Sequence, residues 1–560
     1  MRNILFSIFF LFSFIIFGQN SNIDTVRLKK HIKFLTSDSC EGRNMGARGN
    51  IIAAKYIKSE FEKIGLRPYK NGIEQFTLKS NRSIDSSSYF IVGNKKYVLG
   101  QDFNPSFLSS IGRTKANAVF VKDITKLDVK MVENKWLIFS ADSTDVKNPL
   151  KLNQEKIFIA KDAKAAGVLI VVNNNSPELN KKQSNISIDY NLPIVFISKD
   201  FESILFEMAN IKMNNYYTDT TVTVVDFPLE IEANCSINYE SLVGENVVFE
   251  LPAKNSGKYL IVGAHYDHLG FGGTNSGSRT PEYNQIHYGA DDNASGVAGM
   301  IETARILSES AVKLERNIIF IAFDGEEKGL LGSKYFVDNL SFSKDSIIAM
   351  INFDMIGRMK ENNTFGIAGT GTASELEDIL KTYLDTNKVK ITFQADGYGG
   401  SDQTSFYTSK IPVMFFTTGG HPDYHTPLDT ENKINYRGMS LLLNYSFEVI
   451  SDLTSNERLL HFKETRTKNN DSPSKMKATL GIMPDVTSSE NNGLRVDGVN
   501  PDGAAKKAGI IKGDIIISIN DKKISNIYEY MHSMSKYNKG QEIDVEVLRE
   551  SKSIKLKVIL

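Results

Sequence analysis

Four almost continuously apolar runs between residues 258 and 416 constrain the fold of this chain more than any other feature. They are residues 258–264, 316–323, 346–353 and 411–416. Such runs are typical of strands that are buried on both faces of a parallel sheet. Residues 295–309, which follow the first run, have apolar side chains at helical spacing on one side. The pattern predicts a doubly wound, mostly parallel α/β domain, and such sheets bind ligands beyond the carboxyl ends of their strands.

The other segments differ from this region in composition and in the spacing of their apolar residues. This difference predicts several domains in the 560-residue chain. Residues 24–66 have apolar side chains at helical spacing, residues 80–236 contain short β-rich runs, and residues 464–475 are polar and charged. We expect the following division: an α/β domain in two pieces, 19–80 and 237–462; a β-rich inserted domain, 81–236; a linker, 463–475; and a small C-terminal β domain, 476–560.

The N-terminus has the pattern of a signal peptide. Arg2 is followed by an apolar stretch over residues 4–17, which is shorter than the about 20 residues that a transmembrane helix needs. We expect a signal peptide over residues 1–18 and an exported protein, periplasmic or secreted, with no stable membrane insertion after cleavage. An uncleaved anchor is the alternative.

Charge and cysteine content limit the partners and the chemistry. The formal net charge of +0 disfavours nucleic acid and anionic membranes as partners, because both need a basic surface. Cys40 and Cys235 are the only cysteines, and whether they pair stays open. A metal site in this chain must therefore use histidine and carboxylate ligands.

Histidines and carboxylates follow each of the predicted central strands. His265 and Asp267 lie two apart, hence on one side of an extended segment, so the carboxylate can support the imidazole. An aspartate pair precedes the helix 295–309, where a helix cap is the simple alternative. The complete set is His265, Asp267, Asp291, Asp292, Glu326, Glu327, Asp354 and His425.

Two histidines and three carboxylates suit two metal ions that share a bridging carboxylate. Zn²⁺ accepts imidazole and carboxylate, whereas Ca²⁺ and Mg²⁺ prefer oxygen alone; Mn²⁺ and Co²⁺ are also compatible with these ligands. With two metal ions present, the two adjacent glutamates can have different roles. If Glu327 binds a metal, Glu326 is free to carry a proton between an attacking water and a leaving amine.

Five motifs in this order resemble the two-zinc aminopeptidase family, which includes secreted bacterial leucine aminopeptidases and glutamate carboxypeptidase. They are "HYDHLG", "GADDNASG", "DGEEKGLLGS", "NFDMIG" and "YHTPLDT". The resemblance implies two Zn²⁺ ions per chain and a cis peptide bond after the bridging aspartate. It implies these roles: His265 and Asp354 on one zinc, Glu327 and His425 on the other, Asp292 as the bridge, Glu326 as general base, Asp267 as support for His265, and Tyr424 as donor to the oxyanion.

Two further segments resemble known domains. "AKAAGVLIVV" and "LPIVFIS" resemble a protease-associated domain, within the predicted insert. "ATLGI", with the sequence after it, resembles a bacterial PDZ domain. In such domains the amides of a loop, here Leu480, Gly481 and Ile482, receive a peptide C-terminus, and the peptide adds to a sheet edge. A protein C-terminus is therefore an expected partner, and a packed module with a vestigial groove is the alternative.

We therefore expect an exopeptidase that releases N-terminal residues from peptide substrates. A metal-bridging hydroxide would attack the carbonyl, with Glu326 as general base, and His421, Ser401 and Asp402 line the substrate pocket unless they serve only structural turns. A carboxypeptidase or dipeptidase on the same site is one alternative, and Arg358 is its candidate carboxylate partner. An inactive platform that binds peptides through the PDZ-like domain is the other.

Overall fold

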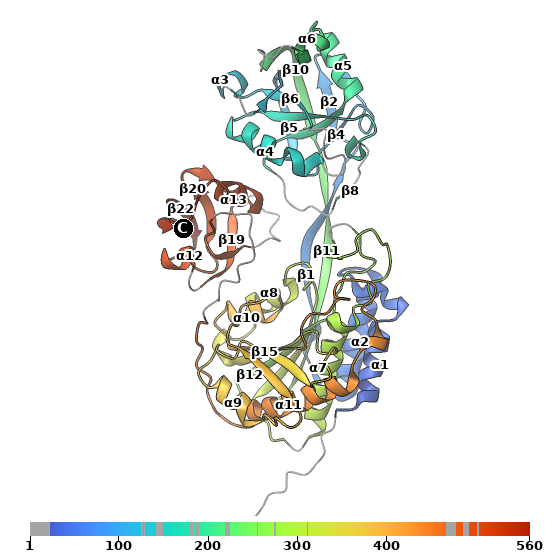
Figure 1. The fold of residues 1–560 in the computed structure, drawn as a ribbon, viewed down its shortest axis with the longest axis vertical. Helices are drawn as coiled ribbons and strands as arrows, with labels where there is room; N and C mark the ends of the chain where they lie inside the picture. The colour runs from blue at the N-terminus through green and yellow to red at the C-terminus, as the bar shows by residue number, and fades with distance from the viewer. Residues whose placement is uncertain are drawn as a thin grey trace, which may run out of the picture.

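The computed structural model describes residues 23–560 except 125–126, 128, 142–148, 180–182, 185–189, 219–223, 255, 274–275, 311, 466–477, 485–491 and 501–502. The predicted signal peptide and most of the predicted linker lie outside the described residues. The described chain forms three sheets, of nine, eight and six strands. They occupy three lobes, which Figure 1 separates clearly.

The largest sheet has the strand order β16-β15-β17-β14-β12-β13-β11-β1-β8. Its four central strands are those predicted from the apolar runs, and they run parallel to one another. The neighbouring pairs β11–β13, β1–β11 and β15–β17 are antiparallel, so the sheet is mixed rather than mostly parallel. The strands are β1 Arg67–Ile84, β8 Gln183–Ser184, β11 Ile237–Leu251, β12 Tyr259–His265, β13 Asn317–Phe323, β14 Ile347–Phe353, β15 Thr364–Ala368, β16 Lys390–Gln394 and β17 Val413–Thr417.

Helices cover both faces of this sheet, as in a doubly wound fold. One face packs against α1 Thr25–Leu35, α2 Arg48–Ile64, α7 Gly296–Glu309, α9 Leu376–Thr382 and α11 Tyr436–Ser455. The other face packs against α8 Leu331–Asp338 and α10 Gln403–Tyr407. Apolar residues at spacings of three and four produce these buried helix faces; in α2 they include Ala54, Ile57 and Phe61.

The long antiparallel pair β1–β11 connects the inserted lobe to the rest of the chain. It extends from the large sheet as a two-stranded ribbon (Figure 1). Its own sheet has the order β3-β2-β10-β5-β6-β7-β9-β4. The strands are β2 Tyr89–Val92, β3 Lys95–Tyr97, β4 Phe103–Pro105, β5 Gly112–Val121, β6 Trp136–Ser140, β7 Gly167–Val172, β9 Ile194–Ser198 and β10 Val224–Cys235.

The sequence predicted a β-rich inserted domain, but this lobe also contains several helices. Strands β5, β6, β7 and β9 are parallel, and helices pack on both faces of the sheet. In α5 the buried Phe201 and Leu205 lie four residues apart, which is the helical spacing. The helices are α3 Val129–Val132, α4 Pro149–Asp162, α5 Lys199–Met208 and α6 Met213–Thr218.

The C-terminal lobe is a small antiparallel β unit with its own apolar core. Its elements are β18 Ile482–Pro484, β19 Leu494–Val499, α12 Ala504–Lys507, β20 Ile515–Ile519, β21 Lys522–Lys523, α13 Ile527–Met534, β22 Glu542–Arg549 and β23 Lys552–Ile559. Among the described residues of the whole chain, no helix has the length and apolarity required to cross a bilayer.

Candidate metal centre

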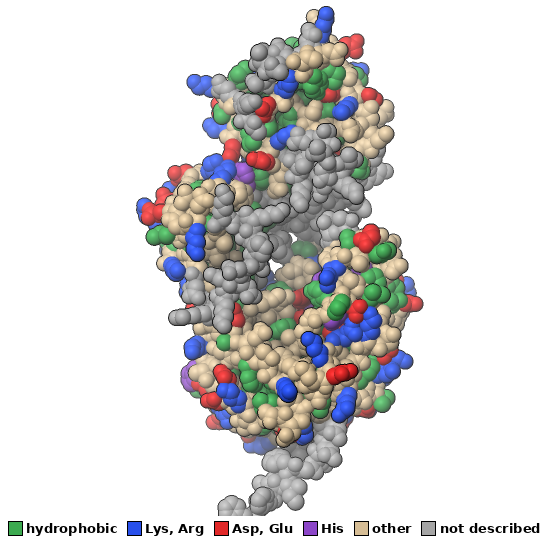
Figure 2. Space-filling model, in the orientation of Figure 1, with side chains coloured by type: hydrophobic (Ala, Val, Ile, Leu, Met, Phe, Trp, Pro, Cys, Tyr) green, Lys and Arg blue, Asp and Glu red, His purple; other side chains and the backbone are tan. Residues whose placement is uncertain are grey.

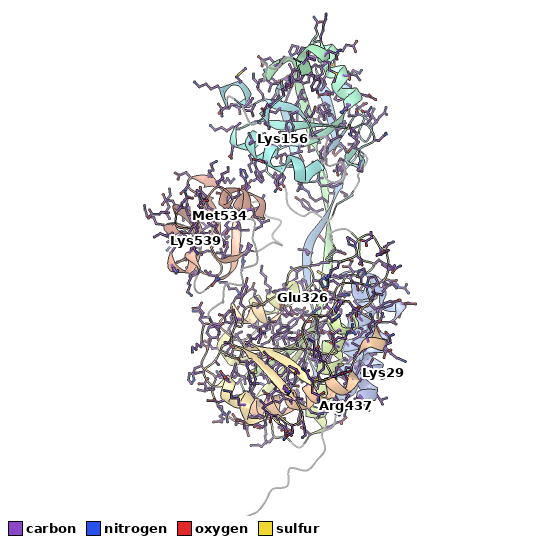
Figure 3. The ribbon with its side chains drawn as sticks, viewed as in Figure 1. Lys29, Lys156, Glu326, Arg437, Met534 and Lys539 are labelled. Carbon is purple, nitrogen blue, oxygen red and sulfur yellow. The ribbon has the colours of Figure 1, made fainter. Side chains whose placement is uncertain are left out.

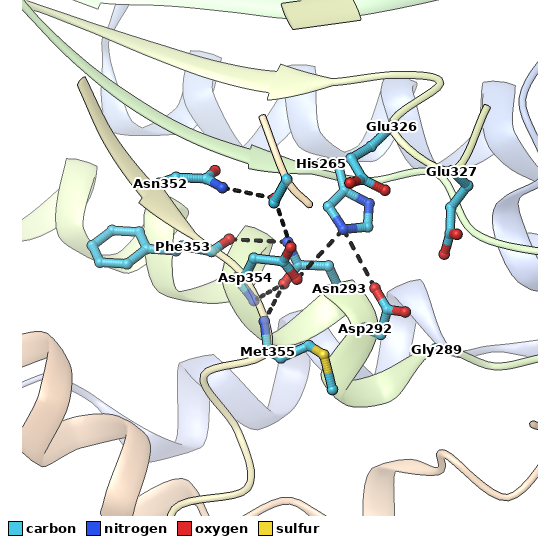
Figure 4. A network of polar contacts seen from close by, with 12 residues as sticks. His265, Gly289, Asp292, Asn293, Glu326, Glu327, Asn352, Phe353, Asp354 and Met355 are labelled. Carbon is cyan, nitrogen blue, oxygen red and sulfur yellow. Dashed lines mark hydrogen bonds and ion pairs between the residues drawn. The ribbon is translucent and has the colours of Figure 1, made fainter. Parts of the chain in front are cut away.

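The parallel register brings the predicted site residues to one edge of the large sheet. His265 is the last residue of β12 and pairs with Phe323, the last residue of β13. Glu326 and Glu327 follow β13, and Asp354 follows β14 directly. Figure 4 shows His265, Asp292 and Asp354 converging at these strand ends, with the two glutamates above them.

Asp292 lies between the two predicted metal histidines and contacts each with a different oxygen. Its Oδ1 is 3.3 Å from His265 Nε2, and its Oδ2 is 3.2 Å from His425 Nε2. Asp354 Oδ1 completes the first group at 3.5 Å from His265 Nε2. Glu327 Oε2 completes the second at 3.2 Å from His425 Nε2. The geometry therefore places all five predicted ligands together, with Asp292 in the bridging position.

Buried atoms in this cluster lack a hydrogen bond of good geometry. They include Asp292 Oδ2, Asp354 Oδ1 and His425 Nε2. Leaving such atoms unsatisfied is costly, and cations bound at the two ligand groups would satisfy them. Imidazole nitrogen and carboxylate oxygen are donors that Zn²⁺ accepts. The residues present therefore fit zinc.

His268 is a member of the cluster that sequence reasoning missed. Its fully buried ring places Nδ1 2.7 Å from Glu327 Oε1 and 3.7 Å from Asp292 Oδ2. Two groups of potential ligand atoms each lie within 4.8 Å of one another: His265, Glu326 and Asp354, and His268, Asp292 and Glu327. His268 stands inside the motif "HYDHLG", but it is an odd number of residues from His265 and was not expected on the same side of an extended segment.

Asp267 supports the site differently from the expectation. Its carboxylate is 3.7 Å from His265 Nδ1, whereas that nitrogen lies 3.2 Å from the backbone oxygen of Asp267. The same carboxylate accepts the backbone N–H groups of Glu326, at 3.0 Å, and Glu327, at 3.2 Å. Asp267 thus orients the loop that carries both glutamates as well as facing the imidazole.

Glu326 is half-buried near the first ligand group. Burial raises the pKa of its carboxyl group well above the usual value, against the attraction of His265. The negative charges of Glu327 and Asp402 raise this pKa further. A carboxyl group with a raised pKa can both accept and return a proton near neutral pH.

The loop before α7 places Asp292 without using the aspartate pair as a helix cap. Asn293 Oδ1 accepts the N–H of Gly296 at 2.9 Å and so caps the helix. Asp291 Oδ1 accepts the N–H of Gly357 instead. The Asp292–Asn293 peptide bond is cis, as the resemblance implies. The cap interpretation of Asp291 and Asp292 is therefore wrong.

Two residues absent from the predicted set hold this loop in place. Asp429 Oδ2 accepts the N–H groups of Asp291, at 2.9 Å, and Asp292, at 3.0 Å. The guanidinium of the fully buried Arg43 donates to the backbone oxygen of Gly289, at 2.9 Å, and to that of Tyr266, at 2.7 Å. Their partners are far away in the sequence, so residue spacing gave no signal for either.

The other predicted pocket residues surround the two ligand groups. Tyr424 stacks on His425, with ring centroids 3.8 Å apart. Ser401 Oγ donates to Asp354 Oδ2 at 2.7 Å, and burial raises the pKa of the neighbouring Asp402 to about 7. His421 Nε2 is 3.3 Å from Asp291 Oδ2. These contacts support the ligand-bearing loops in addition to any contact with substrate.

Arg358 is already paired. Its Nη2 donates to Asp423 Oδ2, and Lys433 Nζ contacts the other oxygen of Asp423 at 2.8 Å. The positive charge needed to hold a substrate carboxylate is therefore used within the chain.

The predicted carboxylate-binding loop of the C-terminal lobe is partly engaged by its own chain. The Gly481 N–H donates to Thr479 Oγ1 at 2.8 Å. The Leu480 and Gly481 carbonyls accept the N–H groups of Ala505, at 2.8 Å, and Asn500, at 2.7 Å. Leu480 itself is fully buried, and Ile482 begins β18, which pairs with β19.

The fold and the site together define an α/β metal-binding domain. Residues 246–449 match peptidase family M28, and residues 478–560 match the PDZ domain family. The chain thus carries a domain of peptidase family M28 followed by a PDZ domain, as the sequence motifs predicted.

Curated relatives and solved structures carry related names. Aminopeptidase YwaD of Bacillus subtilis is 29% identical over 293 residues, which are 49% of this chain and 55% of that protein. A probable leucine aminopeptidase of Arthroderma otae is 30% identical over 212 residues, which are 36% of this chain and 56% of that protein. The chain therefore spans about half the length of these relatives. The solved aminopeptidase from Aneurinibacillus sp. strain AM-1 is 21% identical, with a TM-score of 0.46 over 79% of this chain and 97% of that one.

Proposed function

We propose that this protein is an exported, zinc-dependent aminopeptidase that releases N-terminal residues from peptides. The observation that carries the proposal is Asp292, which faces His265 with one oxygen and His425 with the other. The names of the curated relatives support the choice of reaction. We also propose that the site holds two zinc ions, His265 and Asp354 on one, Glu327 and His425 on the other, with Asp292 shared.

Bound zinc would polarise the peptide carbonyl and acidify a water molecule. Glu326 would take the proton from the attacking water and deliver it to the leaving amine nitrogen, because its carboxyl group lies beside His265 and Asp354 and is not needed as a ligand. Asp267 holds the Glu326 backbone in place through the N–H bond. Tyr424, fixed against His425 by stacking, is the candidate donor to the oxyanion of the tetrahedral intermediate.

The charges around the site favour an aminopeptidase over a carboxypeptidase. Arg358 is already paired with Asp423, so binding of a substrate carboxylate by this cation would compete with an ion pair inside the chain. Asp402, which lies near Glu326 and outside the proposed ligand set, is instead a carboxylate that can attract a free amine. A dipeptidase also needs to hold a free carboxylate and is disfavoured on the same ground.

We propose the predicted domain division as well. The eight-stranded sheet lies within residues 81–236, and the nine-stranded sheet is built outside that range apart from β8 and the last residues of β1. The assignment of the insert to the protease-associated domain and the capture of a protein C-terminus by the Leu480–Gly481–Ile482 loop are proposals supported by the sequence motifs.

The test compares wild type with Glu326→Gln on aminoacyl-anilides and on the same compounds with blocked amines. Zinc content is measured on the same samples. We expect wild type to cleave only the free-amine substrates, and Glu326→Gln to lose about 10²-fold or more of this rate while it retains its zinc. Ser518→Ala, in the C-terminal lobe, is a control that should keep the wild-type rate.

Three outcomes would contradict parts of the proposal. Cleavage of blocked substrates at the same rate would exclude amine recognition. Equal activity of Glu326→Gln and wild type would exclude Glu326 as the base. Zinc binding with no cleavage of either set would favour the inactive binding platform.

A further inference from the structure

The C-terminal lobe contacts the inserted lobe through one cluster of charged residues. Asp162, the last residue of α4, lies 3.0 Å from Lys522 Nζ and 3.1 Å from Lys536 Nζ through its Oδ2. His532 of α13 adds its Nε2 at 3.9 Å from the same oxygen. One carboxylate of the insert therefore faces three basic side chains of the C-terminal lobe.

An aromatic stack and a second ion pair lie beside this cluster. The rings of Phe158 and His532 are parallel within 7°, with centroids 4.1 Å apart. Lys161 Nζ donates to Glu529 of α13 and, at 2.8 Å, to the carbonyl of Tyr190 within the insert. The ion pairs fix the orientation of one lobe relative to the other, and the stacked rings exclude water from the contact. The two together are typical of a specific interface.

The same lobe also contacts the M28 domain. Lys512 Nζ donates to Thr408 Oγ1, at 3.2 Å, and Ser409 Oγ, at 2.8 Å, just after α10. Lys506 Nζ lies 3.0 Å from Glu464 Oε1. A cavity between the two lobes is lined by apolar side chains from both, among them Tyr407 and Phe462 on one side and Val499, Ile510 and Ile511 on the other.

These contacts leave the edge of β18 out of the interface. Asp162, Phe158 and Lys161 contact α13, β21 and the residues after α13, and none of these contacts involves β18 or the Leu480–Gly481–Ile482 loop. The docked helix α13 also contacts the expected peptide-binding loop, because its Tyr530 hydrogen-bonds the backbone of Leu480.

The docked lobe stands beside the region in front of Glu326. Figure 3 labels Glu326 at the end of the M28 lobe nearest to the other two lobes, and Figure 2 shows the molecule hollowed there. The β1–β11 ribbon passes on one side of this region and the C-terminal lobe lies on the other (Figure 1).

We propose that the partner of the α13 face is helix α4 of the same chain, and that this docking limits entry to Glu326 to short or unfolded N-termini. The second part rests on the proposed aminopeptidase function, and the first does not. Displacement of the C-terminal lobe would widen the approach to Glu326. A folded protein with a free N-terminus would then be cleaved faster, while an aminoacyl-anilide would be cleaved at the same rate.

The test reverses the central charge with Asp162→Lys, which places a cation against Lys522, Lys536 and His532. Asp226→Lys is the matched control, because Asp226 is an exposed aspartate of the same lobe that pairs with Lys135 at 2.8 Å. The triple variant Asp162→Lys, Lys522→Glu, Lys536→Glu restores opposite charges. The radius of gyration from solution scattering reports docking, and the rates on an aminoacyl-anilide and on a folded protein substrate report entry.

We expect Asp162→Lys to lower the ratio of docked to undocked molecules about tenfold or more, because attraction is replaced by repulsion, so the radius of gyration rises. The triple variant should restore the wild-type radius of gyration, and Asp226→Lys should have the same radius as wild type. The folded-substrate rate should rise relative to the anilide rate only in Asp162→Lys.

The outcomes separate the two claims. An unchanged radius of gyration in Asp162→Lys would overturn the docking itself. A larger radius with an unchanged ratio of the two rates would overturn the control of entry. Loss of anilide cleavage in all variants, including wild type, would contradict the aminopeptidase proposal and leave the scattering result for docking intact.

Discussion

Arg43 connects two loops that carry metal-site residues, although it lies far from both in sequence. Its guanidinium makes four hydrogen bonds, all to backbone carbonyls: Leu35, Tyr266, Tyr288 and Gly289. Tyr266 follows His265, and Gly289 precedes Asp292 by three residues. A buried cation with this many fixed acceptors holds the loops in one relative position.

We predict that Arg43→Lys lowers the free energy of unfolding of the metal-free protein by about 3 kcal/mol, because one ammonium group does not reach all four carbonyls. Urea denaturation measures this change, and zinc retention during dialysis should fall with it. Arg27→Lys is the control, since Arg27 is exposed and pairs only with Asp24 three residues away. Equal stability of the two variants would contradict the role given to Arg43.

Sequence patterns predicted the metal ligands but not the residues that hold them. His265, Asp354 and His425 follow predicted strands, and parallel strands end at one edge, so their meeting could be inferred. Apart from Leu35, the backbone groups that Arg43 and Asp429 bind are 137 to 246 residues away in the chain. Their side chains have no local pattern that distinguishes them from ordinary loop residues, and only the assembled structure shows their partners.

At the scale of elements, the start of α7 is packed against the end of β14 without space for a side chain. A Cβ atom on Gly296 would lie 2.3 Å from Asn293 Oδ1 and 2.3 Å from the backbone oxygen of Phe353. Asn293 caps the helix, and Phe353 directly precedes Asp354. A glycine here lets the helix start lie close to two metal-ligand segments.

We predict that Gly296→Ala destabilises the protein by about 1–3 kcal/mol, because backbone and cap must shift to relieve the contact. Gly257→Ala is the control, because a Cβ atom at Gly257 meets nothing within 4 Å. The midpoint of urea denaturation distinguishes the two. If Gly296→Ala and Gly257→Ala have the same midpoint as wild type, the close packing described here is wrong.

The central strands were predictable because they are short apolar runs buried on both faces, and the helix 295–309 because its spacing is regular. The elements of the insert were harder to predict from the sequence. Its strands β6, β7 and β9 were recognised, but α4 and α5 were not separated from the β-rich texture around them. The antiparallel outer strands of the large sheet also escaped prediction, since strand direction depends on connections between distant segments.

At the scale of the molecule, the His532 ring reports on the contact between lobes. Burial, together with the positive charges of Lys536 and Lys522, lowers its pKa to about 4 against the attraction of Asp162. A free histidine has a pKa near 6.5. Between these values a lobe that exposes His532 binds a proton that the docked lobe excludes, so the contribution of His532 to docking is full above about pH 6.5 and declines as pH falls toward 4.

We therefore predict that the radius of gyration of wild type rises between pH 7 and pH 4.5, the window set by a pKa that burial lowers to about 4. His532→Phe keeps a ring to stack on Phe158 and removes the titrating group, so its radius should change less. Scattering on both proteins across this range measures the difference. The same rise in both would assign the pH dependence to other groups.

The β1–β11 ribbon has a consequence for how the chain is made. Residues 25–64, which form α1 and α2, pack on strands that begin only at residue 237, after the whole insert has been synthesised. These helices therefore leave the ribosome before the strands on which they pack. Pairing of β1 with β11 then closes a loop of more than 150 residues. The entropic cost of closing a loop grows only slowly with the length of the loop.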